Sequence, residues 1–250
     1  MKILVLMGGE RITVQTSTYP IYMAEIRRKM LVEHKIEQCS SMKPSEMIFC
    51  YRREDVEEFR IDMVLKSLVP KRFVGVEIRS KTAGALCTAL LAVEYLESDE
   101  EIVIVAVDEL LDIDHFEVLN FFRSHVYDAA IVTFPSSHPR YSFARTNKLG
   151  SVYEVVEKQP ISRNALASFY YFKNGNDFIN CAKNVIRKDN KINGSFFLSQ
   201  AINEMVLLGK NIGMFNIDAE KFHPLKTPAQ FNEFFVELRE KALSYEICKD

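Results

Sequence analysis

Two short stretches of the chain combine residue types that could bind a nucleotide and a metal ion. Residues 80–86 (Ser-Lys-Thr-Ala-Gly-Ala-Leu) have mostly small side chains where a strand is expected to lead into a helix. A base or a phosphate can approach the main chain there and use the free N–H groups of the first helical turn. Further on, the apolar run 102–107 ends at Asp108 and Glu109. Carboxylates at the end of a buried strand need a cation or good donors, and such hard oxygen ligands suit Mg²⁺.

Each stretch also has a simpler interpretation. Small residues at the start of a helix pack closely without any ligand, and short motifs of this kind are weak signals. Asp108 and Glu109 also fit a turn before the next helix, for which Asp114 is a suitable N-cap. The residues alone leave both interpretations open.

Further polar residues could meet an anionic ligand on the other side of such a site. Lys158 follows Glu157 at the end of a short expected strand, where it would neutralise a phosphate or form a solvated surface pair. No Ser-His-Asp order and no Cys-His pair stands out, so nucleophilic catalysis is disfavoured. Four further residues could either contact such a ligand or have an ordinary structural role, namely Arg140, Arg145, Arg163 and His223.

The composition is that of an ordinary globular protein. Of the 250 residues, 48% are apolar and 26% are charged, which argues against disorder. The net charge of −2 gives no basic field for nucleic acid. No apolar run approaches the roughly 20 residues of a membrane span, and the start of the chain reads as a first strand rather than a signal peptide, so we expect a cytoplasmic protein without membrane insertion. The five cysteines include no Cys-x-x-Cys pair, so we expect reduced thiols and no zinc site.

The elements that must position these residues alternate in the first half of the chain. Runs rich in Val and Ile predict strands, and segments of helical period lie between them. This is the pattern of a mostly parallel sheet covered on both faces. The expected strands are 3–7, 47–51, 73–78, 102–107 and 129–134, and the expected helices are 29–39, 53–68, 83–96 and 115–124.

The second half is richer in short strands and follows without a linker. We therefore expect one domain over residues 1–250, with a nucleotide-binding half at 1–135 and an acceptor-binding half at 136–250. The last helix is expected to be capped by Thr227, with Pro228 at its first position. The expected strands are 141–145, 152–156, 168–172 and 212–217, with a turn at 147–150, and the expected helices are 175–187, 196–208 and 227–243.

In open α/β sheets, ligands bind beyond the carboxyl ends of the strands. Gly8 and Gly9 follow the first strand, residues 79–84 follow the third, and Asp108 ends the fourth. The sequence therefore predicts that these three candidates lie on one edge of the sheet.

Several spaced segments, in this order, resemble one enzyme family. The chain resembles the nucleoside-triphosphate:sugar-phosphate nucleotidyltransferases of the GT-A-like Rossmann class, in particular small single-domain members encoded with bacterial capsule and lipopolysaccharide genes. The segments that carry the resemblance are 6–9, 19–21, 29–31, 81–86, 107–109, 141–143, 155–158, 193–194 and 227–228.

The resemblance implies a three-layer α/β/α fold and a reaction in which an acceptor phosphate attacks the α-phosphorus of an NTP and pyrophosphate leaves. Such chemistry needs Mg²⁺ and cationic side chains rather than a nucleophile. The implied nucleotide-binding residues are Met7, Gly8, Gly9, Arg79, Lys81, Thr82, Ala83, Gly84 and Asp108. The implied acceptor-binding residues are Tyr141, Glu157, Lys158, Arg163, Asn193 and His223. The implied catalytic residues are Arg11, Lys29, Asp108 and Lys158, and the implied metal ligands are Asp108, Glu109 and Asp218.

The chain also departs from the family pattern. The glycine-rich loop is shortened, so that Arg11 is the substitute for its arginine, and Tyr19 stands where the family has a catalytic lysine. Ser195 replaces a glutamate after the Asn-Gly turn, and Pro224 replaces the late metal-binding aspartate. The cations that could compensate are Arg27, Arg28 and Lys29, and the second carboxylates are Glu109 and Asp218.

A Tyr-Pro segment and a His-Pro-Leu-x-Thr-Pro ending resemble the capsule-decorating branch that includes the CTP:phosphoglutamine cytidylyltransferases. This favours transfer of CMP from CTP to phosphoglutamine or a sugar 1-phosphate. Two alternatives stay open, a catalytically weakened nucleotide-binding or regulatory subunit and a GT-A glycosyltransferase. Whether the chain forms a homodimer is also left open.

Overall fold

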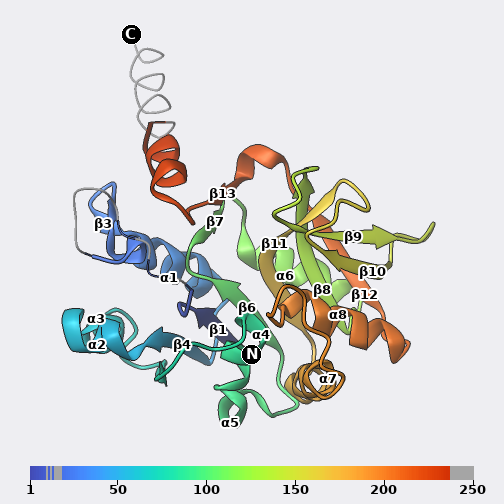
Figure 1. The fold of residues 1–250 in the computed structure, drawn as a ribbon, viewed down its shortest axis with the longest axis horizontal. Coiled ribbons are helices and arrows are strands. Elements are labelled where there is room, and N and C mark those ends of the chain that lie inside the picture. The colour runs from blue at the N-terminus through green and yellow to red at the C-terminus, as the bar shows by residue number, and fades with distance from the viewer. Residues whose placement is uncertain (10, 12, 14–18, 237–250) are drawn as a thin grey trace.

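A mixed β-sheet forms the centre of the molecule (Figure 1). The structure is a computed structural model that describes residues 1–9, 11, 13 and 19–236. On one side of the sheet, β1 pairs in parallel with β4 and β6, and β4 pairs with β5. Because Leu6 pairs with both Cys50 and Ala106, these strands end at one edge of the sheet. The four strands are β1 (Lys2–Leu6), β4 (Glu46–Arg52), β5 (Phe73–Ile78) and β6 (Ile102–Ala106).

Antiparallel pairing extends the sheet on the other side. Strand β11 runs antiparallel to both β6 and β8, and β12 runs parallel to β8. The start of β11 also pairs with β9, whose partner is β10, so this hairpin lies beyond the carboxyl end of β6. The strands are β8 (Ala129–Pro135), β9 (Ser142–Thr146), β10 (Val152–Glu157), β11 (Asn164–Phe172) and β12 (Ile212–Asn216).

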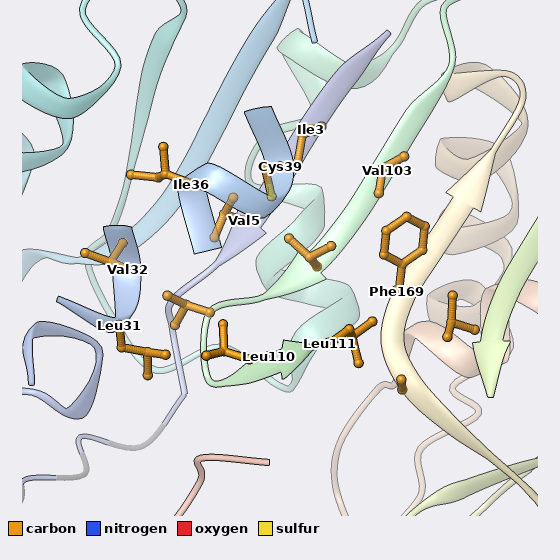
Figure 2. Close-up of a cluster of buried hydrophobic side chains, with 14 of the residues drawn as sticks. Ile3, Val5, Leu31, Val32, Ile36, Cys39, Val103, Leu110, Leu111 and Phe169 are labelled. Atoms are coloured by element: carbon orange, nitrogen blue, oxygen red, sulfur yellow. The ribbon is translucent and has the colours of Figure 1, made fainter. Parts of the chain in front are cut away.

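Two hydrophobic clusters cover the two faces of the sheet. Successive side chains of a strand point to opposite faces, so Ile3 and Val5 belong to one cluster and Leu4 to the other. Figure 2 shows Ile3 and Val5 facing the side chains of helix α1 (Leu31–Ser41). Since both faces are buried, the parallel strands read as continuous apolar runs. This is the three-layer α/β/α fold that the sequence predicts.

Helices contribute apolar side chains to both clusters. The first cluster takes side chains from α1 (Leu31–Ser41), α2 (Arg53–Phe59), α3 (Ile61–Leu68) and α6 (His115–Ser124), and the second from α4 (Ala85–Leu90), α5 (Val93–Leu96), α7 (Gly175–Arg187) and α8 (Leu198–Leu207). The remaining short elements are η1 (Ile21–Met23), β2 (Glu25–Ile26), β3 (Lys29–Met30), β7 (Glu109–Leu111), η2 (Ala219–Lys221) and β13 (Phe222–Pro224).

Several helix boundaries differ from the prediction. The helix expected at 29–39 begins at Leu31, because Lys29 and Met30 form a strand that pairs with β2. The helix expected at 53–68 is two helices, since Arg60 between them has a left-handed φ of 54°. The helix expected at 83–96 is likewise divided, and it begins after Gly84, whose φ is 113°.

Other local predictions are confirmed. Asp114 caps α6 by accepting hydrogen bonds from the N–H groups of Phe116 and Glu117. Thr227 Oγ1 accepts a hydrogen bond from Gln230 N, and residues 228–236 are helical, while the remainder of the helix expected at 227–243 lies outside the described residues. The turn at 147–150 joins β9 to β10.

Two further observations concern the described residues. None of their helices has the length and apolar character that a membrane span requires. Their cysteines, namely Cys39, Cys50, Cys87 and Cys181, are free thiols, as the sequence predicts, whereas Cys248 lies outside them.

Candidate functional site

A cavity of about 490 Å³ lies at the carboxyl edge of the parallel strands. Its wall combines the ends of β1 and β6 with the β9–β10 hairpin and the start of α8. The structure therefore brings together residues from both expected halves of the chain. The sequence-predicted site residues that line this cavity are Gly8, Gly9, Lys81, Thr82, Gly84, Asp108, Glu109, Arg140, Tyr141, Glu157 and Lys158.

The small-residue loop before α4 is held against a second loop. Leu86 N donates a hydrogen bond to Phe196 O (3.2 Å), and Phe196 N donates one to Ala83 O (2.7 Å). A Cβ atom on Gly84 would lie 2.4 Å from Phe196 O, so only glycine allows this approach. Gly84 therefore serves close packing of two backbones, which is the simpler interpretation of the motif, and the loop so formed also lines the cavity.

The predicted turn at Asn193 and Gly194 is present and explains how the second loop is shaped. Both residues have positive φ angles, and Ser195 N donates a hydrogen bond to Ile192 O (3.1 Å). Asn193 is exposed and does not line the cavity, whereas Ser195 does. The role of Asn193 is thus to turn the chain toward residues 83–86.

The two carboxylates after β6 have different environments. Glu109 is buried and accepts hydrogen bonds from Ser168 N (2.7 Å) and Ser168 Oγ (2.9 Å), and it forms an ion pair with Lys226. Asp108 is partly exposed and lines the cavity, with its backbone oxygen accepting a hydrogen bond from Leu225 N (2.8 Å). Asp108 is therefore the carboxylate that faces the cavity with its side chain available.

Burial and charge shift the pKa values of this group in opposite directions. Burial, together with the charge of Glu109, raises the pKa of Asp108 above its ordinary value, although Lys226 opposes the shift. Burial acts to raise the pKa of Glu109 too, but Lys226 and the donors of Ser168 lower it below its ordinary value. Partial desolvation acts to lower the pKa of Lys226, yet Glu109 and Asp108 raise it overall. The charges of Glu109 and Lys226 thus compensate each other, whereas the negative charge of Asp108 is only partly compensated by Lys226.

A buried lysine supports the same turn from behind. Lys35, on α1, donates a hydrogen bond to the backbone oxygen of Glu109, and burial lowers the pKa of its ammonium. Gln38 of the same helix donates to Leu111 O (2.8 Å). These contacts hold the turn between β6 and β7 against α1.

The opposite wall presents positive charge. Lys158 has a left-handed φ of 57°, and its ammonium lies 5.1 Å from the centre of the Phe197 ring. Glu157 beside it accepts hydrogen bonds from Ser142 Oγ and Ser199 Oγ, which fix its carboxylate. Among the described residues, no ion pair engages three cations of the cavity wall, so their charge is available to an anionic ligand. These cations are Arg140 and Lys158 on the opposite wall and Lys81 in the small-residue loop.

A second charged group, centred on Asp55, borders a small neighbouring cavity of about 40 Å³, which Arg11, Tyr22 and Arg52 line. The Asp55 carboxylate is fully buried, accepts a hydrogen bond from the Tyr22 hydroxyl (2.6 Å), and lies 3.5 Å from Arg52 Nε and 3.8 Å from Arg11 Nε. Arg11 also makes two hydrogen bonds to Glu58, at 3.0 and 2.6 Å. Arg11 is therefore directed to this small cavity, which Met7 and Asp108 also line, rather than to the large one.

Other predicted residues lie away from the large cavity. Asp218 is highly exposed and faces Lys221 (3.7 Å), and Arg79 faces Glu77 (4.0 Å). Lys29 pairs with Glu37 on the surface. His223, on β13, packs against the Phe234 ring, and Arg163 and Ala83 are exposed outside the cavity wall. Tyr19, which stands where the resemblance implies a lysine, is 51% exposed and contacts Phe59.

The predicted set of three metal-binding carboxylates is consequently not assembled. Glu109 is engaged by Ser168 and Lys226, and Asp218 lies elsewhere, so of the three only Asp108 remains available. Within the described part of the chain, no cluster of three or more His, Cys, Asp and Glu side chains could hold a metal. One carboxylate is sufficient for Mg²⁺ where substrate phosphates supply further ligands, so Asp108 fits Mg²⁺ only in that reduced form.

Sequence reasoning missed two charged residues of the site. Lys226 lines the large cavity and Arg52 lines the small one. Arg52 directly follows the strand expected at 47–51, so the sequence already indicates that it lies at the carboxyl edge of the parallel strands. Lys226 had no such signal, because β13 and β7 are short strands whose pairing cannot be read from a periodic pattern.

No protein-family model and no curated protein matches the sequence. Several solved structures match its fold. A nucleoside-diphosphate-sugar pyrophosphorylase from Vibrio cholerae RC9 is 20% identical, with a TM-score of 0.76 over 94% of this chain and 99% of that one. A UDP-glucose pyrophosphorylase in complex with UDP-glucose is 16% identical, with a TM-score of 0.76 over 96% and 98%.

A protein from Bacillus anthracis described as a glucose-1-phosphate thymidylyltransferase is 14% identical, with a TM-score of 0.77 over 95% of each chain. At these identities the similarity concerns the fold, and it extends over nearly the whole length of both partners. The chain therefore has the mixed α/β fold of these sugar-nucleotide pyrophosphorylases and nucleotidyltransferases.

Proposed function

We propose that the protein is a nucleotidyltransferase that moves an NMP group from an NTP to a phosphorylated small molecule and releases pyrophosphate. The observation that carries the proposal is the cavity itself. Backbone-rich loops from the first half of the chain form one wall, and two cations from the second half, Arg140 and Lys158, which no described residue engages in an ion pair, form the other. Such a cavity can hold two phosphorylated ligands side by side. The proteins that share the fold are named as pyrophosphorylases, which supports this class of reaction.

The wall at Gly8, Gly9 and Thr82 is suited to the nucleotide. Gly8 lies so close to β5 that a Cβ there would be 2.4 Å from Ile78 Cδ1, whereas no described residue lies within 4 Å of a Cβ placed on Gly9. Lys81, at the same wall, would neutralise part of the triphosphate charge. Mg²⁺ would accompany the triphosphate and neutralise charge on its phosphates, with Asp108 as the carboxylate of this chain that faces it.

The wall at Lys158, Arg140 and Tyr141 is suited to the acceptor. Lys158 and Arg140 would hold the acceptor phosphate, whose oxygen attacks the α-phosphorus as the bond to the β-phosphate breaks and pyrophosphate leaves. No side chain has to become covalently bound, so positioning and charge neutralisation carry the reaction. We favour CMP as the transferred group and phosphoglutamine or a sugar 1-phosphate as acceptor, in the synthesis of a capsule or surface polysaccharide, on the resemblance described above.

A product assay tests the proposal. Each of the four NTPs, with Mg²⁺, is incubated with pooled phosphorylated sugars and amino acids, and products are identified by mass spectrometry. We expect pyrophosphate and one nucleotidylated acceptor. Lys158→Met should raise the KM for the acceptor about ten-fold or more, because a charged contact to phosphate is lost. Lys148→Met, at the exposed turn of the same hairpin, is the matched control and should leave the KM unchanged.

Absence of turnover with every NTP would refute the proposal. One observation favours a second candidate, a nucleotide-binding subunit without catalysis. Tyr19 and Arg11, which stand at the positions of family cations, do not line the large cavity. That candidate predicts a higher melting temperature with an NTP but no pyrophosphate. Release of a nucleoside diphosphate from a nucleotide sugar would instead identify a glycosyltransferase.

A further inference from the structure

Lys226 lies at the point of the cavity where the two carboxylates after β6 meet the acceptor wall. Its ammonium forms an ion pair with Glu109, and its side chain is 45% exposed at the cavity wall. Asp108 and Tyr141 line the same cavity and lie close enough to interact electrostatically with Lys226. The ammonium thus stands between the expected nucleotide and acceptor sides.

The position of Lys226 is imposed by the backbone. Strand β13 pairs antiparallel with β7, which places Pro224 opposite Glu109. Leu225 N then donates a hydrogen bond to Asp108 O (2.8 Å), and Lys226 N donates one to Gln230 Oε1 (3.0 Å). These two hydrogen bonds fix the backbone on both sides of the Lys226 side chain. The ammonium can therefore move only through changes of the side-chain rotamer.

The donors around Glu109 leave it little capacity to bind a metal. The Glu109 carboxylate is 4% exposed, and its two oxygens accept from Ser168 N, Ser168 Oγ and the Lys226 ammonium. A divalent ion at Glu109 would have to displace the ammonium and would then lie beside an unpaired, like-charged lysine. An ammonium has three donors, and Lys226 uses at least one on Glu109, so others can serve a ligand in the cavity.

We propose that Lys226 is a fixed cation of the reaction site, which takes the place beside Glu109 that a metal ion would need and donates directly to a substrate phosphate held between the two cavity walls. This inference rests on the proposed function, because it assumes that the ligand is phosphorylated. The positive charge that neutralises Glu109 then comes from a side chain of the protein and not from a metal ion. Any Mg²⁺ that accompanies the triphosphate then has Asp108, and not Glu109, as its protein ligand.

The first arm of the test needs no nucleotide and no activity. Binding of Mn²⁺ to the unliganded protein is measured by electron paramagnetic resonance for the wild type, Lys226→Asp and Lys226→Met. Lys226→Asp replaces the ammonium by a third carboxylate beside Asp108 and Glu109, so we expect Mn²⁺ to bind at least about ten-fold more tightly than to the wild type. Lys148→Asp makes the same charge change at an exposed turn and should bind Mn²⁺ as the wild type does.

The second arm measures the phosphate contact. Binding of CTP, UTP, ATP and GTP is measured by calorimetry in EDTA and again with Mg²⁺. For the NTP that binds, we expect the affinity of the wild type in EDTA to lie within about ten-fold of its affinity with Mg²⁺. In EDTA, Lys226→Met should bind that NTP about ten-fold or more weakly than the wild type does. Lys226→Arg should retain most of it, because the charge and donors remain.

The outcomes separate this inference from the proposed function. Mn²⁺ binding to the wild type as tight as to Lys226→Asp overturns the inference, as does an unchanged NTP affinity of Lys226→Met in EDTA. If no NTP binds under any condition, the proposed function fails, and the Mn²⁺ arm alone then decides whether Lys226 excludes a metal from Glu109. Circular dichroism confirms folding, and if Lys226→Asp does not fold, Lys226→Met and Lys226→Arg still decide the NTP arm.

Discussion

Substitution of Gly84 by alanine should destabilise the protein more than substitution of any other cavity glycine. Gly84 has φ 113° and ψ 176°, a backbone region that only glycine adopts readily. Its missing Cβ would meet three backbone atoms of Phe196, the nearest at 2.4 Å. Backbone atoms cannot rotate away as the end of a side chain can, so the two loops must separate.

The size of the effect follows from these contacts. Backbone strain of this kind costs about 1–3 kcal/mol. Separation of the loops also weakens the hydrogen bonds Leu86 N to Phe196 O and Phe196 N to Ala83 O, each of which contributes about 1 kcal/mol. We therefore expect Gly84→Ala to lower the free energy of unfolding by about 3–5 kcal/mol, a large part of the roughly 5–15 kcal/mol of a typical domain.

Urea denaturation followed by circular dichroism measures this change, and two neighbouring glycines supply controls. A Cβ on Gly9 would have no described residue within 4 Å, so Gly9→Ala should leave the free energy of unfolding unchanged or slightly raised. Gly8→Ala meets Ile78 Cδ1, the flexible end of a side chain, and should cost about 1 kcal/mol. A loss below about 1 kcal/mol for Gly84→Ala, or a loss no larger than for Gly8→Ala, would refute the reasoning.

Two further predictions concern buried polar groups. Asp55→Ala removes a fully buried carboxylate from Tyr22, Arg52 and Arg11, so it should lower the free energy of unfolding by about 3–5 kcal/mol in urea titrations, whereas the partly exposed Asp62→Ala should change it far less. Burial lowers the pKa of His115 to about 4, so between pH 6.5 and about 4 the unfolded chain binds a proton that the folded one does not. The free energy of unfolding should fall by about 3 kcal/mol as the pH drops through this window. His115→Gln should remove that part of the pH dependence, and an unchanged slope would contradict the assignment.

The strands and the active edge of the sheet could be predicted because their signals are local. A strand buried on both faces needs a continuous apolar run, and β1, β4, β6 and β8 each have one. Parallel pairing then aligns the ends of β1 and β6, which places Gly8 and Asp108 on the same edge of the sheet.

The helix boundaries and the charged partners depend on contacts that no local pattern contains. Nothing in the spacing of residues 53–68 announces the left-handed turn at Arg60, since arginine usually continues a helix. The contact between Lys35 and the backbone oxygen of Glu109 joins a helix to a distant turn. Asp218 and Lys29 were reasonable candidates by resemblance, but the chain directs both to the surface.

The sequence by itself determined the α/β architecture, the common edge of Gly8, Thr82 and Asp108, and the small-residue loop before α4. Local burial and strand geometry are sufficient for these. Only the tertiary structure decided which carboxylate stays available. Glu109 is neutralised by Lys226 because β13 pairs with β7, and Asp108 is left facing the cavity. Two short strands that lie far apart in the chain have no periodic pattern from which their pairing could be predicted. The group that balances a charge is the one that the fold places beside it, so the sequence alone does not identify it.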